Sequence, residues 1–346
     1  MTFFPSASYN VRVKIICKFL DGKKGCGVKV GVIGTGVMGK HHVRVYSSLN
    51  DHCQLVGVYD ADQKRAQEVA QEYDILSFPT LDELLAQVDA VSIAVPISAH
   101  FEVGMACIRH GVHMLMEKPI TATIAEADEL IDRAKEAKLH LQVGHIELFN
   151  PAIAVLRSIL EDEEIVAIDM HRMSPMEPRI QGIDVVLDAM LHDIYILQHL
   201  QPGSLDRMHA VGKYYQGAIK HAVALFQFDS GVIAQITASH LTEEKVRTLR
   251  VVTRQAFVQV DLLDRKVVIS RSTNFYLEKQ SDGYSQQNIL EKVVVPGIEP
   301  LRAELLDFLQ SITTKKPALV TAESGLQALR LATEITQQIK RNVSAN

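Results

Sequence analysis

Along residues 28–144, short apolar runs alternate with longer segments in which apolar positions recur every three or four residues. The short runs are typical of buried strands, and the longer spacing is typical of amphipathic helices. Strands that alternate with helices in this way form a parallel, doubly wound sheet. Thr80 with Glu83 predicts a capping box, and Gly111 predicts a helix end. We expect the strands at 28–33, 54–59, 75–77, 90–95, 112–116 and 141–144, and the helices at 37–49, 61–73, 81–86, 98–110 and 123–138.

The pattern changes after Pro151. Expected helices at 152–160 and 183–200 flank a strand at 165–171. Asp229-Ser230-Gly231 is a hairpin turn, so we expect a mainly antiparallel sheet that helices cover on one face. Its other strands follow one another without an intervening helix, at 208–215, 222–228, 232–239, 247–253, 256–260 and 266–270. A polar loop at 272–287 and helices at 301–312 and 322–339 complete the chain.

These two patterns predict an α/β protein with two domains, at residues 28–148 and 149–346, and a length of 346 residues agrees with that number. Residues 1–27 fit neither pattern. We expect them to be a disordered extension, or one created by translation from a start upstream of Val28. Neither alternative gives this segment a chemical role.

Composition argues against several classes of function. The net charge of −5 gives no support for binding nucleic acid or a membrane surface. No apolar run approaches the roughly 20 residues that a membrane helix needs. The four cysteines lack the spacing of metal ligands and indicate no disulfide framework. We therefore expect a cytoplasmic protein without a bound metal.

The strand expected at 28–33 leads into the spacing G-x-G-x-x-G, formed by Gly34, Gly36 and Gly39. Glycines at these positions permit a tight turn, let a pyrophosphate approach the backbone and let the next helix pack on the strand. Asp60 ends the second strand, where an acid can accept hydrogen bonds from a ribose hydroxyl. This combination predicts a dinucleotide-binding Rossmann domain; the alternative is a tight turn in another α/β fold.

Further candidates follow the carboxyl ends of the other strands, which is where such sheets bind ligands. Lys118 is the strongest of them, because Pro119 keeps it extended and ends its strand, so that its side chain projects towards the cofactor. Polar residues also occur in such loops without a function. The residues that we expect at the cofactor are Gly34, Thr35, Gly36, Val37, Met38, Gly39, Asp60, Val95, Pro96, Glu117 and Lys118.

A second group of candidates lies in the helix expected at 183–200. Asp188 and His192 are four residues apart, a spacing that places both on one face of an α-helix. Among apolar neighbours they need either a polar cavity or each other, so a self-satisfied pair is the alternative to a catalytic one. Removal of a hydride from an alcohol also requires removal of the hydroxyl proton, which Lys118 or His192 could accept.

Other charged residues are assigned from their surroundings. Arg172 and Arg179 flank a proline-rich segment and are either solvated or an anion clamp over the cleft, since the forked donors of arginine suit phosphate or carboxylate. For Asp193 we expect a buried capping or ion-pair role. His41 and His42 are expected to be structural or exposed to solvent.

The glycine spacing, Asp60, Glu117-Lys118-Pro119 and Asp188-x-x-x-His192 together resemble the Gfo/Idh/MocA oxidoreductases, from Val28 to the C-terminus. The resemblance implies a Rossmann domain followed by an α/β domain with an open, mainly antiparallel sheet that is often used for dimer or tetramer contacts. It also implies that Lys118, Asp188 and His192 match the catalytic lysine, aspartate and histidine of that family.

A narrower resemblance rests on the segments 143–151 and 172–175 and on the residues around Asp188. These segments are similar to dehydrogenases that act at C3 of UDP-N-acetylglucosamine or its uronate. Leu148 departs from that branch, which has arginine there, and Tyr195 stands where the branch more often has an acid. The substrate contacts expected from the resemblance are Lys118, His145, Asn150, Arg172, Asp188 and His192.

The leading hypothesis is an NAD-dependent dehydrogenase that acts on a secondary alcohol of a pyranose, at C3 of a UDP-linked N-acetylhexosamine or its uronate, and that forms a homodimer or homotetramer. One alternative is a dehydrogenase of a free sugar or a polyol such as inositol. Another is an NAD(H)-binding sensor or scaffold without turnover. We expect NAD rather than NADP, because the carboxylate of Asp60 would repel a 2′-phosphate, whereas Lys64 and Arg65 in the next helix are solvated cations.

Overall fold

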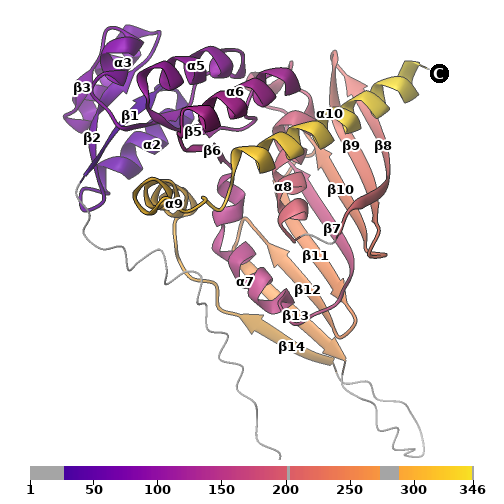
Figure 1. Ribbon diagram of the computed structural model, residues 1–346. Helices are drawn as coiled ribbons and strands as arrows, with labels where there is room; N and C mark the ends of the chain where they lie inside the picture. The colour runs from indigo at the N-terminus through magenta and orange to yellow at the C-terminus, as the bar shows by residue number, and fades with distance from the viewer. Residues whose placement is uncertain (1–26, 201–202, 273–287, 345–346) are drawn as a thin grey trace, which may run out of the picture.

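The structure is a computed structural model that describes residues 27–200, 203–272 and 288–344. The expected N-terminal extension and the expected polar loop fall almost entirely outside these residues. Figure 1 shows a first sheet among the purple helices and a second sheet as a broad layer beside it.

The first domain is the predicted parallel, doubly wound sheet, with the strand order β3-β2-β1-β4-β5-β6. The order reverses between β1 and β4, so the carboxyl ends of these strands border the crevice where such sheets bind ligands. The strands are β1 (Val28–Ile33), β2 (Cys53–Tyr59), β3 (Leu76–Ser77), β4 (Ala90–Ile93), β5 (His113–Glu117) and β6 (Leu141–Gly144). The helices are α2 (Val37–Ser47), α3 (Gln63–Tyr73), α4 (Leu81–Leu85), α5 (His100–His110) and α6 (Ile124–Glu136).

Local sequence signals explain where several of these helices begin and end. Gly111 closes α5 in the left-handed conformation, with φ of 71°, as predicted. The capping box expected at Thr80 forms only in part: the Glu83 N–H donates to the Thr80 hydroxyl, but the Glu83 carboxylate accepts from that same hydroxyl. A complete capping box opens α6 at Thr123.

The second domain contains the expected mainly antiparallel sheet, with the order β14-β13-β12-β11-β7-β10-β9-β8. Among the described strands of this sheet, only the neighbours β7 and β10 run parallel. Gly231 has φ of 86° in the predicted turn between β9 and β10. The strands are β7 (Ile165–Met173), β8 (Leu205–Tyr215), β9 (Ala218–Phe228), β10 (Ile233–Ser239), β11 (Val246–Thr253), β12 (Ala256–Asp261), β13 (Lys266–Ser272) and β14 (Asn288–Val293), the last of which was not predicted.

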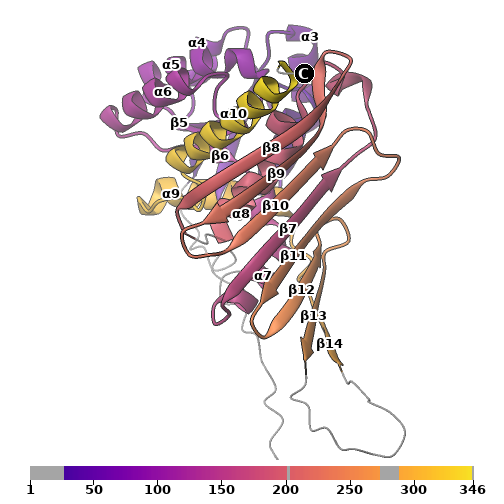
Figure 2. The same ribbon diagram turned by 90° about the vertical axis from the view of Figure 1, so that its right-hand side faces the viewer.

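Helices cover one face of this second sheet, as Figures 1 and 2 show from two directions. They are α7 (Pro151–Leu160), a π-helical turn (Val186–Met190) continued by α8 (Leu191–Leu200), and α10 (Ala322–Ser344). The apolar residues between these helices and the sheet form one core with part of the first domain. No helix among the described residues is long and apolar enough to cross a membrane.

No described helix lies over the opposite face of the second sheet (Figure 2), and this face exposes apolar side chains. Leu225 is 47% exposed and Ile233 is 56% exposed on neighbouring strands. Both line a shallow depression of about 640 Å³. This face is the surface on which the sequence resemblance predicts subunit contacts.

The helix α9 (Pro300–Thr314) lies in the second half of the chain but packs against the first domain. Its apolar residues, including Leu305 and Phe308, share a core with Tyr46 and Leu49 at the end of α2. The helix α9 therefore packs with the first domain in space, although the predicted boundary at residue 148 assigns it to the second domain.

Candidate active site

The glycine turn has the shape that a dinucleotide requires. Gly34 adopts φ of 87°, and a Cβ there would lie 2.6 Å from the Ala94 carbonyl oxygen. A Cβ on Gly39 would overlap the Gly34 carbonyl, whereas nothing lies within 4 Å of a Cβ on Gly36. Close packing around the first and third glycines and open space at the second fit a pyrophosphate at the start of α2, where free N–H groups point.

Asp60 lies at the end of β2 and is 9% exposed. Its Oδ2 accepts hydrogen bonds from the Thr35 N–H at 2.6 Å and from the Thr35 hydroxyl at 2.9 Å. Burial raises the pKa of Asp60, but these bonds and one from the Asp62 N–H outweigh burial and lower it. Asp60 is therefore a carboxylate bound to the glycine turn, and its contact with a ribose stays a prediction. Arg65 lies 3.9 Å from its Oδ2.

The other expected cofactor residues border the same crevice. Val95 lies beside Gly34, and Pro96 precedes the short 3₁₀ turn Ile97–Ala99. The carboxylate of Glu117 lies 3.0 Å from Nε2 of His42 on α2. Through this contact Glu117, the residue before Lys118, joins the end of β5 to the helix that follows the glycine turn. The contact also gives the buried His42 the structural role expected for it.

Lys118 reaches from the first domain to the second. Its Nζ donates to the backbone oxygen of Asp188 at 2.9 Å and to Oδ1 of Asp188 at 3.2 Å. Burial raises the pKa of Asp188, but hydrogen bonds from His240 and Lys118 and the charge of Lys118 lower it far more. The pair is therefore an ammonium against a carboxylate, and it joins the two groups of residues that the sequence singled out separately.

Asp188 lies in the π-helical turn and His192 lies in α8, so the single α-helix expected to carry both residues is interrupted between them. Asp188 contacts Lys118 and, through Oδ2, lies 3.3 Å from Nε2 of His240. The self-satisfied pair with His192 is thus replaced by contacts to two other elements.

The buried His145 and the half-buried His192 lie beside Lys118. Their rings lie edge to face with centroids 6.4 Å apart, and His145 stacks on Tyr195. Burial lowers the pKa of each imidazole well below its ordinary value, and the charge of Lys118 lowers it further. Both rings are therefore neutral near pH 7. The Nδ1 atom of each has no hydrogen-bond partner among the described residues.

Arg172 does not lie where the sequence suggested, since it is neither solvated nor a clamp above the cleft. It is 5% exposed, and its Nε lies 3.1 Å from both carboxylate oxygens of Asp193. Its Nη1 donates to Glu147 at 3.1 Å, and Arg247 donates to the same oxygen at 2.9 Å. A buried network therefore uses this guanidinium and gives Asp193 the ion pair expected for it. The side chain of Arg179 lies outside what the structure describes.

Asn150 makes structural contacts, and its expected contact with a substrate stays a prediction. Its Oδ1 caps α7 by accepting from the Ala152 N–H at 3.1 Å, and its Nδ2 donates to the Leu262 carbonyl at 3.1 Å. Leu148, the residue that departs from the narrower branch, is 5% exposed within the apolar core.

Sequence reasoning missed His240 and the pair of Glu147 and Arg247. His240 follows the carboxyl end of β10 and is 1% exposed. A single histidine after a strand belongs to no recognisable spacing, so only its position after a strand end could have drawn attention to it.

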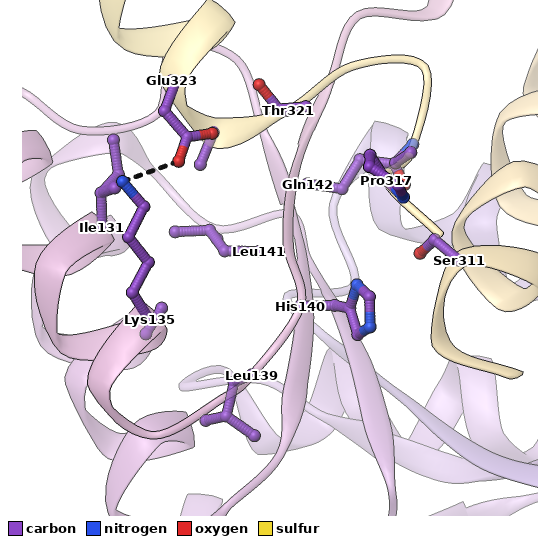
Figure 3. Close-up of a pocket in the computed structure, with 13 residues that line it drawn as sticks. Ile131, Lys135, Leu139, His140, Leu141, Gln142, Ser311, Pro317, Thr321 and Glu323 are labelled. Atoms are coloured by element: carbon purple, nitrogen blue, oxygen red, sulfur yellow. Dashed lines mark ion pairs between the residues drawn. The ribbon is translucent and has the colours of Figure 1, made fainter. Parts of the chain in front are cut away.

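A separate cavity of about 170 Å³ lies at the amino end of β6 (Figure 3). Lys118, in contrast, follows the carboxyl end of the neighbouring parallel strand β5. Lys135 and Glu323 form an ion pair of 2.9 Å at this cavity. Its lining comes from α6, β6 and the segment that leads into α10, so it lies apart from the candidate site.

Two family models match this chain over most of its length. One is the oxidoreductase family with an NAD-binding Rossmann fold, at residues 28–145, and the other is the C-terminal alpha/beta domain of that family, at residues 163–345. The chain therefore belongs to the Gfo/Idh/MocA oxidoreductases and is a dehydrogenase by class.

Individual relatives narrow the comparison. UDP-N-acetylglucosamine 3-dehydrogenase of Acidithiobacillus ferrooxidans is 33% identical over 310 residues, which cover 89% of this chain and 96% of that protein. Its structure matches with a TM-score of 0.84, over 92% of this chain and 99% of the other. Myo-inositol 2-dehydrogenase of Thermotoga maritima is 23% identical over 91% of this chain and 98% of that protein. Levoglucosan dehydrogenase in complex with NADH, at 17% identity and a TM-score of 0.78 over 91% and 98% of the two chains, shares the fold.

Proposed function

We propose that this enzyme oxidises a secondary alcohol of a pyranose with NAD, at C3 of a UDP-linked N-acetylhexosamine or its uronate. The observation that carries the proposal is the ammonium of Lys118, held by Asp188 of the other domain beside the two neutral imidazoles of His145 and His192. The similarity to UDP-N-acetylglucosamine 3-dehydrogenase supports the nucleotide sugar as the substrate class.

The residues of the chain fit NAD, which supplies a hydride acceptor when it is bound. The glycine turn would hold the pyrophosphate at Gly36, because Gly36 is the one of its three glycines that has open space around it. Asp60 would accept from the adenosine ribose with the lone pairs that Thr35 and Asp62 leave available. The NAD preference is part of the proposal, and Arg65, next to Asp60, is the residue that could oppose it.

In the proposed reaction Lys118 binds the oxygen of the reacting hydroxyl. His192 accepts the hydroxyl proton, which this imidazole can do because burial and the charge of Lys118 keep it unprotonated. Asp188 orients the Lys118 ammonium, and His145 hydrogen-bonds a second sugar hydroxyl. Lys118 and Asp188 need little rearrangement when the substrate binds, because the contacts between them already exist in the free enzyme.

A panel of sugars tests the proposal. The enzyme and NAD⁺ are mixed with UDP-N-acetylglucosamine, its uronate, free N-acetylglucosamine and inositol, and the absorbance of reduced nicotinamide is followed. We expect turnover with a UDP-sugar and thermal stabilisation by UDP alone. Turnover of inositol without stabilisation by UDP would favour the polyol alternative. Tight NADH binding without turnover across the panel would favour the sensor.

We further propose that two copies associate through the open face of the second sheet. Exposed apolar residues such as Leu225 and Ile233 on adjacent strands give this face an area that a partner would bury. Light scattering of the wild type and of Ile233→Glu checks this: the charge should reduce the mass of the particle, and an unchanged mass would contradict the proposal.

A further inference from the structure

The two carboxylate oxygens of Asp188 have different partners. Oδ1 lies 3.2 Å from Nζ of Lys118, and Oδ2 lies 3.3 Å from Nε2 of His240. His240 is 1% exposed, and its Nδ1 has no hydrogen-bond partner among the described residues. Among the described residues, the polar contact of the His240 ring is therefore with Asp188. This contact uses the carboxylate oxygen that Lys118 does not contact.

The strand ends around His240 also hold the segment that carries Asp188. The His240 N–H donates to the Lys220 carbonyl at 2.8 Å. Nζ of the fully buried Lys220 donates to the carbonyls of Ile180 and Ile183, at 2.6 and 2.8 Å. The Ile219 N–H donates to Asp184 at 2.8 Å. The ends of β9 and β10 thus fix the chain just before the π-helical turn, and His240 fixes the side chain on that turn.

We propose that His240 is a positioning residue that acts through Asp188. Its Nε2–H donates to Oδ2 and sets the rotation of the carboxylate, so that Oδ1 faces the Lys118 ammonium. Lysine has a long, flexible side chain that holds a defined position only when an acceptor is fixed. This inference rests on the proposed role of Lys118 in binding the reacting hydroxyl, but it goes beyond that role to a residue outside the site's motifs.

The simpler alternative is that His240 only fills space at the strand end. Phenylalanine would fill that space but could not donate, whereas glutamine could still donate to Oδ2 from a side chain that reaches a similar distance. The two roles therefore predict different results for His240→Phe and His240→Gln. His110→Phe is a matched control, because His110 makes a similar contact of 3.0 Å with Asp82 on the surface of the first domain.

We expect His240→Phe to lower kcat by about 10- to 100-fold, the effect of losing one hydrogen bond to a charged group. NADH affinity and melting temperature should stay near those of the wild type. His240→Gln should recover most of the activity, and His110→Phe should match the wild type. In the Asp188→Asn background, His240→Phe should cost less than twofold further, because a residue that acts through Asp188 has nothing left to position.

A readout without substrate separates this inference from the proposed substrate. The rate at which an amine reagent labels Lys118, followed by mass spectrometry, should rise in His240→Phe to the rate found in Asp188→Asn, with Lys135 as the internal reference. If no UDP-sugar turns over, the proposed substrate fails, but the labelling still tests His240. The inference would be overturned if His240→Phe changed neither the labelling rate of Lys118 nor kcat. It would also be overturned if the loss of kcat in the double variant equalled the product of the losses in His240→Phe and Asp188→Asn.

Discussion

Nζ of Lys118 donates to both the backbone oxygen and the carboxylate of Asp188, at 2.9 and 3.2 Å. This contact connects the end of a strand in the cofactor domain to the π-helical turn of the second domain. The amine is therefore oriented before a substrate arrives, which reduces the ordering that the reaction itself must supply.

Lys118→Ala should lower kcat by a factor of about 10²–10³, because the ammonium that binds the reacting oxygen and stabilises its developing negative charge is lost. Steady-state rates with the substrate found in the sugar panel measure the loss. Lys135→Ala is the control, because its ion pair with Glu323 is on the surface and worth at most about 1 kcal/mol. A loss of only a few-fold in folded Lys118→Ala would remove the amine from the chemistry.

Asp60→Ser should narrow the preference for NADH over NADPH by about tenfold or more, since it removes a charged acceptor for the ribose. Fluorescence titration with both cofactors measures the ratio. Asp62→Ser is the matched control: serine still caps α3, and Asp60 keeps its bonds to Thr35. Tighter binding of NADPH by the wild type would show that Arg65 decides the preference.

Arg172→Met should lower the free energy of unfolding by about 3–5 kcal/mol, because Asp193 would remain as a buried carboxylate without its partner. The double variant Arg172→Met/Asp193→Leu removes both charges and should recover most of that loss. Urea unfolding compares the three proteins. If Arg172→Met instead weakened substrate binding at unchanged stability, Arg172 would be a substrate-binding residue.

Glu304 on α9 has no exposed surface, and its pKa is raised well above 4.5 by burial and by the charges of Glu117 and Asp307. The folded state therefore holds this proton more tightly than the unfolded state, so the stability it confers is lost as pH rises above the ordinary carboxyl range. Glu304→Gln keeps the shape without the titration.

The stability of Glu304→Gln relative to the wild type should consequently increase from pH 5 to pH 8, by up to about 1.4 kcal/mol per pH unit between the unfolded and folded pKa values. Urea unfolding at several pH values measures the difference. A constant difference across this range would mean that Glu304 is ionised in the folded protein.

Much of the first domain could be predicted because its signals are local. Each apolar run, cap and glycine acts on its own neighbours, and β1 has the predicted bounds Val28–Ile33. The strand β14 (Asn288–Val293) was missed because its apolar residues Ile289, Leu290 and Val293 neither alternate with polar residues nor form one run, and it pairs only with β13 among the described strands. An edge strand needs little burial, so it leaves a weak pattern.

The candidate site could be predicted only in part, because its contacts depend on residues distant in the sequence. Lys118 and Asp188 were identified one at a time, yet 70 positions separate them. Arg172 was misplaced because an arginine is most often exposed, and its burial depends on Asp193, 21 residues away. The π-helical turn was missed because a sequence spacing of four presupposes an ordinary α-helix.

The position of α9 has a consequence for the order in which the protein can fold during synthesis. The cofactor domain is complete only when Leu305 and Phe308 reach the core beside Tyr46. About 150 residues lie between the end of the last strand of that domain and α9, and a ribosome needs roughly 8 to 30 s to add them. During that interval the nascent first half exposes an apolar surface, on which a chaperone could bind until the chain itself supplies the missing helix.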